Sequence, residues 1–245
     1  MDMKRDLIHK LQQNILMWQG YRPTVAASSE QIGLGVIESA FPGGVFPKRA
    51  IHEFITVFPE QAAASGGFIA GLLAVLMDGG AACVWVSTSR RLFPAALRAF
   101  NADPERIIFV DVKTEKDVLW IMEEALKCEG LAAVVAELNQ LSLTASRRLQ
   151  LAVEESGVTG FILRKEARKT AGSVTAARWQ ISPLPSNAED GLPGLGFPRW
   201  QVELQKVRNG NPGSWILEWA GDAFVEVAPL QKENIWSEDR NRQIG

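Results

Sequence analysis

The sequence predicts an α/β domain: a mostly parallel sheet with flanking helices, extended at its C-terminal end by an antiparallel hairpin. Two observations carry this prediction. Strand-length apolar runs alternate with helical patterns as far as residue 164, which is typical of a parallel sheet covered by helices on both sides. Further along, the β-rich runs RWQVELQKVR and SWILEWAG flank NGNPG, whose residues favour a hairpin turn.

The strands of the parallel part are expected to be buried on both faces, because their apolar runs are nearly continuous. We expect them at 50–57, 82–87, 106–112, 131–138 and 158–164. A short strand is expected at 178–182, between polar and Pro/Gly-rich loops. The hairpin strands then complete the sheet.

Helical patterns lie between these strands. They are expected at 68–77, 94–100, 118–127 and 144–156. Thr144 is expected to cap the last of them and Gly157 to end it in a left-handed conformation. A separate N-terminal helix is expected within 1–20, where apolar residues recur every three or four positions, and we interpret it as a packing helix.

Composition narrows the class of protein. The chain has 245 residues with 26 Lys and Arg against 28 Asp and Glu, which excludes a uniformly basic nucleic-acid binder but not a local basic patch. Its two cysteines have no spacing typical of a disulfide framework or a zinc site. The longest apolar stretch, 68–77, is too short to span a bilayer, and the start lacks signal-peptide features. We therefore expect a cytoplasmic protein without membrane contact.

The loop after the strand 50–57 is the first place to look for chemistry, because ligands of α/β sheets bind at the carboxyl ends of strands. A phosphate-binding loop needs glycines that free backbone N–H groups and a lysine that reaches the outer phosphates. This segment reads FPEQAAASGG, and no lysine occurs between Lys48 and Lys113. Ser65–Gly67 at a helix start could hold an anion, but we favour close packing or helix entry for these glycines. We expect no nucleotide chemistry.

Other candidate residues point to structure rather than catalysis. Glu137 ends the strand 131–138 and could bind a metal, be solvated, or pair with Arg147 or Arg148. His52 has no nucleophile motif near it, and a packed core histidine is the favoured interpretation. No catalytic residue, cofactor site or metal site is predicted.

Basic residues and tryptophans suggest binding instead. Residues 140–180 carry a local excess of Arg and Lys, and the segment RKEARKTAGS could follow a phosphate backbone, although a solvated loop fits its composition equally well. Trp215 and Trp219 share one side of an expected strand. Trp236 lies alone in the polar tail, where an indole could anchor a partner.

The order of these parts resembles the RecA-like ATPase core over residues 30–228. Within that superfamily, PGGVFPKRAIHEF, LTASRRLQLA and PRWQVELQKVRNGNPGSWILEW look most like the ImuA family, the RecA-like accessory proteins of bacterial SOS-induced mutagenic DNA repair. The chain departs from active ATPases at the phosphate loop, and VSTSRR stands where those enzymes present a catalytic glutamate. The resemblance thus implies a 30–228 domain without working nucleotide motifs, preceded by the 1–20 helix and followed by a polar tail, 229–245.

The resemblance also implies partners. They include ImuB, which is a Y-family polymerase-like adaptor, and ImuC, which is an error-prone polymerase. RecA and single-stranded DNA are the other two partners that it implies. The residues it implies as DNA-facing are Arg147, Arg148, Arg164, Lys165, Arg168 and Lys169. Trp215, Trp219 and Trp236 are the expected protein-contact residues. Two alternatives stay open at this point: a cell-division inhibitor similar to SulA, and a residual DNA-dependent ATPase.

Overall fold

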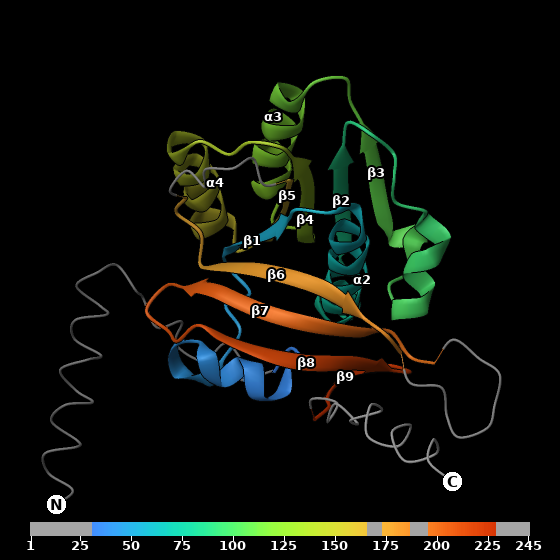
Figure 1. Ribbon diagram of the computed structural model, residues 1–245. Coiled ribbons are helices and arrows are strands. Elements are labelled where there is room, and N and C mark those ends of the chain that lie inside the picture. Colours follow the sequence, from blue (N-terminus) through green and yellow to red (C-terminus); the bar gives the residue numbers. More distant parts are fainter. Residues whose placement is uncertain (1–30, 166–172, 187–195, 229–245) are drawn as a thin grey trace, which may run out of the picture.

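The computed structural model describes residues 31–165, 173–186 and 196–228. They form one sheet in the order β3-β2-β4-β5-β1-β6-β7-β8-β9 (Figure 1). Its strands are β1 (Ile51–Thr56), β2 (Ala82–Ser87), β3 (Ile107–Asp111), β4 (Leu131–Leu138), β5 (Thr159–Lys165), β6 (Ala177–Leu184), β7 (Arg199–Val207), β8 (Gly213–Ala220) and β9 (Ala223–Glu226). The strands from β3 to β6 in this order run parallel, and β7, β8 and β9 alternate in direction. The predicted fold class is confirmed, while β9 was missed.

Helices cover both faces of the parallel part. They are α2 (Pro59–Leu76), α3 (Glu115–Leu126) and α4 (Leu143–Ser156), with 3-10 helices η1 (Gly35–Ala40), η2 (Pro42–Gly44), η3 (Pro94–Phe100) and η4 (Pro104–Arg106). α3 and α4 lie side by side over one face, and α2 packs on the other (Figure 1). In the described parts of the chain, none of the helices is long and apolar enough to cross a membrane.

Helix boundaries show where the sequence patterns were incomplete. α2 begins at Pro59, nine residues before the expected start at Phe68. α4 is capped by Ser142, whose hydroxyl accepts a hydrogen bond from the Ala145 amide, so the expected Thr144 cap was wrong. Gly157 does end α4 in the left-handed conformation, with φ of 78°. The stretch 94–100 is a 3-10 helix rather than an α-helix.

The core is largest between α2 and the sheet. Trp179 on β6 is fully buried there, and it stacks on Phe54 of β1 with ring centroids 5.9 Å apart. β7 and β8 continue this core with Trp200, Val202, Leu204, Leu217 and Trp219. The segment that precedes β1 also covers this core, because Phe46 and η1 pack against the same cluster (Figure 1, blue). The antiparallel extension is therefore part of one core with the parallel sheet.

Candidate functional site

The junction between β1 and α2 occupies the place where a phosphate-binding loop would be needed. β1 ends at Thr56 and α2 begins at Pro59, so only two residues connect them. The Gln61 side-chain oxygen accepts hydrogen bonds from the backbone amides of Val57, at 2.8 Å, and Phe58, at 3.4 Å. Pro59 has no N–H, and Glu60 adds a negative charge to the first turn. Two of the amides that could face a phosphate are thus occupied by the Gln61 side chain.

Ser65, Gly66 and Gly67 lie in the interior of α2 and are all buried. The expectation that they stand at a helix start was wrong, because the alanine-rich segment before them is already helical. A Cβ atom on Gly67 would lie 2.7 Å from the ring of Phe100. Close packing against η3 is therefore what this glycine provides.

His52 is a core residue, as predicted. Its side chain is fully buried and stacks on Phe46 at a centroid distance of 4.3 Å. Nε2 donates to the Pro47 carbonyl at 2.8 Å, and Nδ1 accepts from the Trp179 indole at 3.4 Å, which fits one neutral tautomer. Burial lowers the pKa of His52 to about 4, and the Pro47 hydrogen bond opposes this shift only in part. The ring is neutral at physiological pH.

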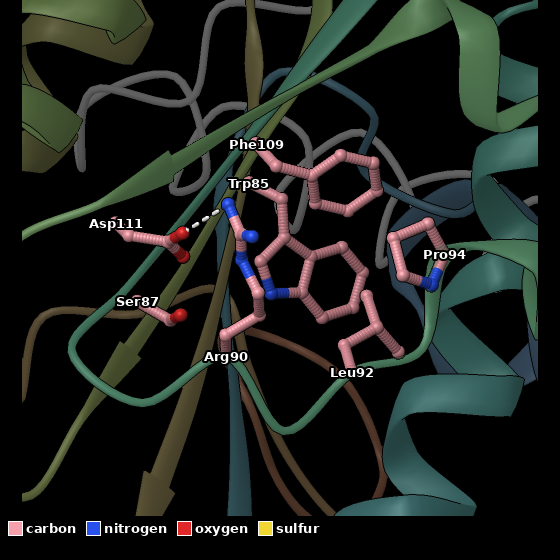
Figure 2. A pocket seen from close by; sticks show the side chains of 7 residues that line it. All are labelled: Trp85, Ser87, Arg90, Leu92, Pro94, Phe109 and Asp111. Atoms are coloured by element: carbon pink, nitrogen blue, oxygen red, sulfur yellow. Dashed lines mark ion pairs between the residues drawn. The ribbon is translucent and has the colours of Figure 1, made fainter.

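A recess of about 220 Å³ opens at the carboxyl ends of β2 and β3. Figure 2 shows apolar walls formed by Trp85, Leu92, Pro94 and Phe109, and a polar mouth where Arg90 forms an ion pair with Asp111 beside Ser87. That pair is largely exposed, so its contribution to stability is small, about 0–1 kcal/mol. This recess lies beside the segment VSTSRR and was not predicted from the sequence.

Glu137 extends from β4 toward the same edge. Its Oε1 accepts a hydrogen bond from the Trp85 indole at 2.9 Å. Burial raises the pKa of Glu137, against the opposing effects of the Trp85 hydrogen bond and the nearby Arg91 charge. Arg148 pairs with Glu123 of α3 at 2.5 Å instead of with Glu137. Over the described ranges, no group of three or more His, Cys, Asp or Glu side chains could hold a metal ion.

The predicted DNA-facing residues separate into exposed and buried groups. Arg147 and Arg148 are exposed on α4, and Lys165 is exposed at the end of β5. Arg164 is only 4% exposed, because its guanidinium forms an ion pair with the buried Glu53 of β1. A direct DNA contact by Arg164 is therefore corrected to a structural role. Arg168 and Lys169 lie outside the described residues.

Glu53 is the centre of a buried polar cluster. Its Oε1 lies 3.0 Å from Arg164 Nε, and its Oε2 lies 2.8 Å from Arg178 Nε on β6. Ser173 Oγ donates to the same Oε2 at 2.8 Å, and Lys206 Nζ on β7 donates to the Ser173 carbonyl at 3.0 Å. We call these five residues the Glu53 cluster. Sequence reasoning missed it because its members are brought together only by strand pairing.

The tryptophans that were predicted to contact partner proteins differ in how deeply they are buried. Trp219 is 3% exposed, donates its indole N–H to the Ala99 carbonyl at 3.0 Å and packs on Phe224. It has no free side-chain surface for a partner, so this prediction is corrected to a core role. Trp215 is half-buried against the same core. Trp236, the segment 1–20 and the tail 229–245 lie outside the described residues.

Comparisons with known proteins support this fold and indicate a family. The chain is 39% identical over 226 residues to protein ImuA of Caulobacter vibrioides, in both strain NA1000 / CB15N and strain CB 15, and the match covers 85% of this chain and 93% of that protein. The crystal structure of the RadB recombinase superposes with a TM-score of 0.55 at 13% identity, covering 81% of this chain and 99% of RadB. That likeness shows a RecA-like fold alone. No protein-family model matches the sequence. The identity to ImuA over most of both chains nevertheless shows that this protein belongs to the ImuA family.

Proposed function

We propose that this protein is a non-catalytic accessory factor of error-prone translesion DNA synthesis in the SOS response, and that it acts by joining ImuB, the ImuC polymerase and RecA or DNA. Membership of the ImuA family supports the place in damage-induced mutagenesis. A polymerase complex at a lesion needs a component that joins proteins, and that task needs no phosphoryl transfer. A RecA-like domain can supply the necessary rigid surface.

The proposal that the protein does not hydrolyse nucleotides rests on the β1–α2 junction. Nucleotide hydrolysis requires a loop of free amides and a cation on the phosphates. Here the connection has two residues, the Gln61 side chain takes two of its amides, and the sequence supplies no lysine from 49 to 112. The first turn of α2 also contains Pro59, which has no N–H, and Glu60, whose negative charge disfavours an anion at this helix end.

Calorimetric titration with Mg-ATP and Mg-ADP tests this part directly. We expect no heat of binding up to millimolar nucleotide, with or without single-stranded DNA, and no release of phosphate. An active RecA-type ATPase titrated under the same conditions is the positive control. Micromolar affinity for ATP would contradict the proposal and favour a residual DNA-dependent ATPase.

Partner capture tests the accessory role. We expect the full chain to retain an ImuB-like adaptor and, through it or directly, the ImuC polymerase. The candidate interface segments are the N-terminal segment 1–20, the β8 region at Trp215 and the tail with Trp236. Removal of 229–245 and, separately, of 1–20 assigns the contact to one end of the chain. Capture of the tubulin-like division protein without any ImuB would instead favour a division inhibitor similar to SulA.

For DNA, the proposal omits Arg164, which is buried, and Arg148, whose guanidinium already pairs with Glu123. Arg147 and Lys165 are exposed in the structure, and Arg168 and Lys169 stay predictions from the sequence. Replacing these four residues by alanine is expected to weaken binding to single-stranded oligonucleotides whatever their sequence, because contacts to phosphates carry no base information. Fluorescence anisotropy over a range of salt concentrations measures this effect. Unchanged affinity would mean that these side chains merely face solvent.

A further inference from the structure

Three cations and one carboxylate meet on the face of the sheet that carries Glu53. Glu53 of β1 and Arg178 of β6 are paired residues of adjacent parallel strands, and Arg178 is in turn paired with Lys206 of β7. The three residues therefore form one row across three strands. Arg164 of β5 reaches the same carboxylate from the other side.

The charges in this cluster do not balance. Glu53 is fully buried, and each of its oxygens is already within 3.0 Å of one guanidinium. Arg164 is also buried, and its Nη2 atom has no hydrogen-bond partner among the residues that the structure describes. Uncompensated positive charge in a poorly solvated place favours the approach of an anion, since little screening weakens the attraction there. The cluster thus has capacity for a negative ligand.

The accessible part of the cluster is formed by Arg178 and Lys206. The Arg178 side chain is 16% exposed, and Lys206 is an exposed residue whose ammonium contacts the Ser173 carbonyl. The apolar cluster beneath α3 and α4 includes no described residue of β6 or β7. α4 contacts the segment just before β6, where Ser146 Oγ accepts a hydrogen bond from the Val174 amide at 3.1 Å. An anion can approach Arg178 and Lys206 from solvent, with the Arg164 charge behind them.

The surroundings favour a nucleic acid over a protein as the source of that anion. Protein interfaces need an apolar centre, commonly aromatic. None of the exposed large hydrophobic residues in the described ranges lies on β6 or β7. The neighbouring side chains are polar instead: Gln205 donates to Gln180 across the two strands at 2.6 Å, and Glu203 is the strand partner of Gln180. Proteins that contact the phosphate backbone of a nucleic acid commonly do so through a polar, positively charged surface that needs no apolar anchor.

We propose that Arg178 and Lys206 form a binding site for the phosphodiester groups of single-stranded DNA, in which Glu53 holds the guanidinium of Arg178 in place. This site deepens the DNA contact in the proposed function and rests on it. It adds two residues beyond those implied by family resemblance. Arg164, which cannot reach DNA directly, contributes its charge from the interior.

The variants Lys206→Gln and Arg178→Gln test the site, with Lys127→Gln as matched control, because Lys127 is an exposed lysine on the far α3–β4 connection that pairs with Glu124. The probe is a fluorescent oligothymidine measured by anisotropy between 50 and 200 mM salt. Each site variant is expected to lower the slope of log affinity against log salt by roughly 0.7, the value for one phosphate contact on a single strand. Lys127→Gln is expected to leave the slope unchanged.

The variant Arg178→Lys distinguishes the loss of a positive charge from a general disturbance of the structure. This variant keeps the charge, so it should retain most of the salt slope, and thermal melting verifies that each variant is folded. Equal slopes for the wild type and both site variants would overturn the site while leaving DNA binding intact. A wild-type protein that binds no oligonucleotide would overturn the DNA contact itself, without bearing on capture of ImuB. If polyglutamate of matched charge binds as tightly and with the same loss in the variants, the site belongs to an acidic protein and the nucleic-acid proposal is wrong.

Discussion

At the scale of single residues, strand geometry decides which cations can meet a ligand. Arg164 and Lys165 are neighbours in the sequence, yet successive side chains of a strand point to opposite faces. Arg164 therefore meets the buried Glu53, while Lys165 remains exposed at the end of β5. A count of basic residues along the chain treats the two alike. Only the position of Glu53 on the neighbouring strand separates them.

His52 makes the stability of the protein depend on pH. Its pKa is about 4 in the folded chain and near 6.5 when exposed, so the unfolded state binds the proton more readily. The stabilising effect of keeping this ring neutral is fully present above pH 6.5 and is lost as pH falls toward 4. We expect the free energy of unfolding, measured with urea, to fall by about 1.5 kcal/mol between pH 6.5 and pH 5.

Replacement of the histidine provides the control for this prediction. His52→Gln cannot take up a proton, so its free energy of unfolding should be lower overall but should change less over the same pH interval. His9→Gln, the matching change at the only other histidine, should preserve the wild-type dependence. A wild-type decrease that persists in His52→Gln would assign the effect to other groups.

At the scale of elements, α2 shows how packing overrides local preference. It contains three glycines, at 66, 67 and 71, although glycine disfavours helix by about 1 kcal/mol relative to alanine. Gly67 allows the approach of Phe100 of η3, and Gly71 allows the approach of Trp219 and Phe224. Packing was one of two roles expected for Gly66 and Gly67, and Gly71 was not singled out. The partners of Gly67 and Gly71 come from η3, β8 and β9, which are distant along the chain.

Gly71→Ala tests this packing. A Cβ atom there would lie 2.6 Å from Phe224 and 2.9 Å from Trp219, so the rings of β8 and β9 must move. Overpacking of this kind outweighs the gain in helix preference, and we expect a net loss of about 1–2 kcal/mol in the free energy of unfolding. Gly79→Ala, at a turn where no heavy atom lies within 4 Å, should change it by less than about 0.5 kcal/mol. Equal effects of the two substitutions in chemical denaturation would contradict this account.

At the scale of the whole molecule, the parallel sheet and its antiparallel extension share one core. Five buried side chains of that core come from β7 and β8. Burial of each such side chain is worth about 1.5–3 kcal/mol, so together they approach the whole stability of a typical domain. The extension is therefore needed for folding and is not an appended module.

Truncation tests this conclusion. A fragment of residues 30–228 is expected to melt in one cooperative transition, followed by circular dichroism. A fragment of residues 30–186, which lacks β7, β8 and β9, is expected to remain unfolded because Phe68 would lose its ring contact with Trp200 and Trp179 its strand partner Leu204. A cooperative transition in the shorter fragment would mean that the RecA-like part folds alone.

The sequence by itself determined the α/β class, the positions of eight of the nine strands along the chain and the family, because these depend on periodicity, turn residues and motifs that are local in the chain. It also indicated that His52 is a core residue and that the segment after β1 lacks the lysine of a phosphate-binding loop. Only the tertiary structure decided that Arg164 and Trp219 are buried, and that Glu53, Arg178 and Lys206 form a row. The physical reason is that burial and charge pairing depend on which strands become neighbours, and residues more than a hundred positions apart have no local pattern that records this.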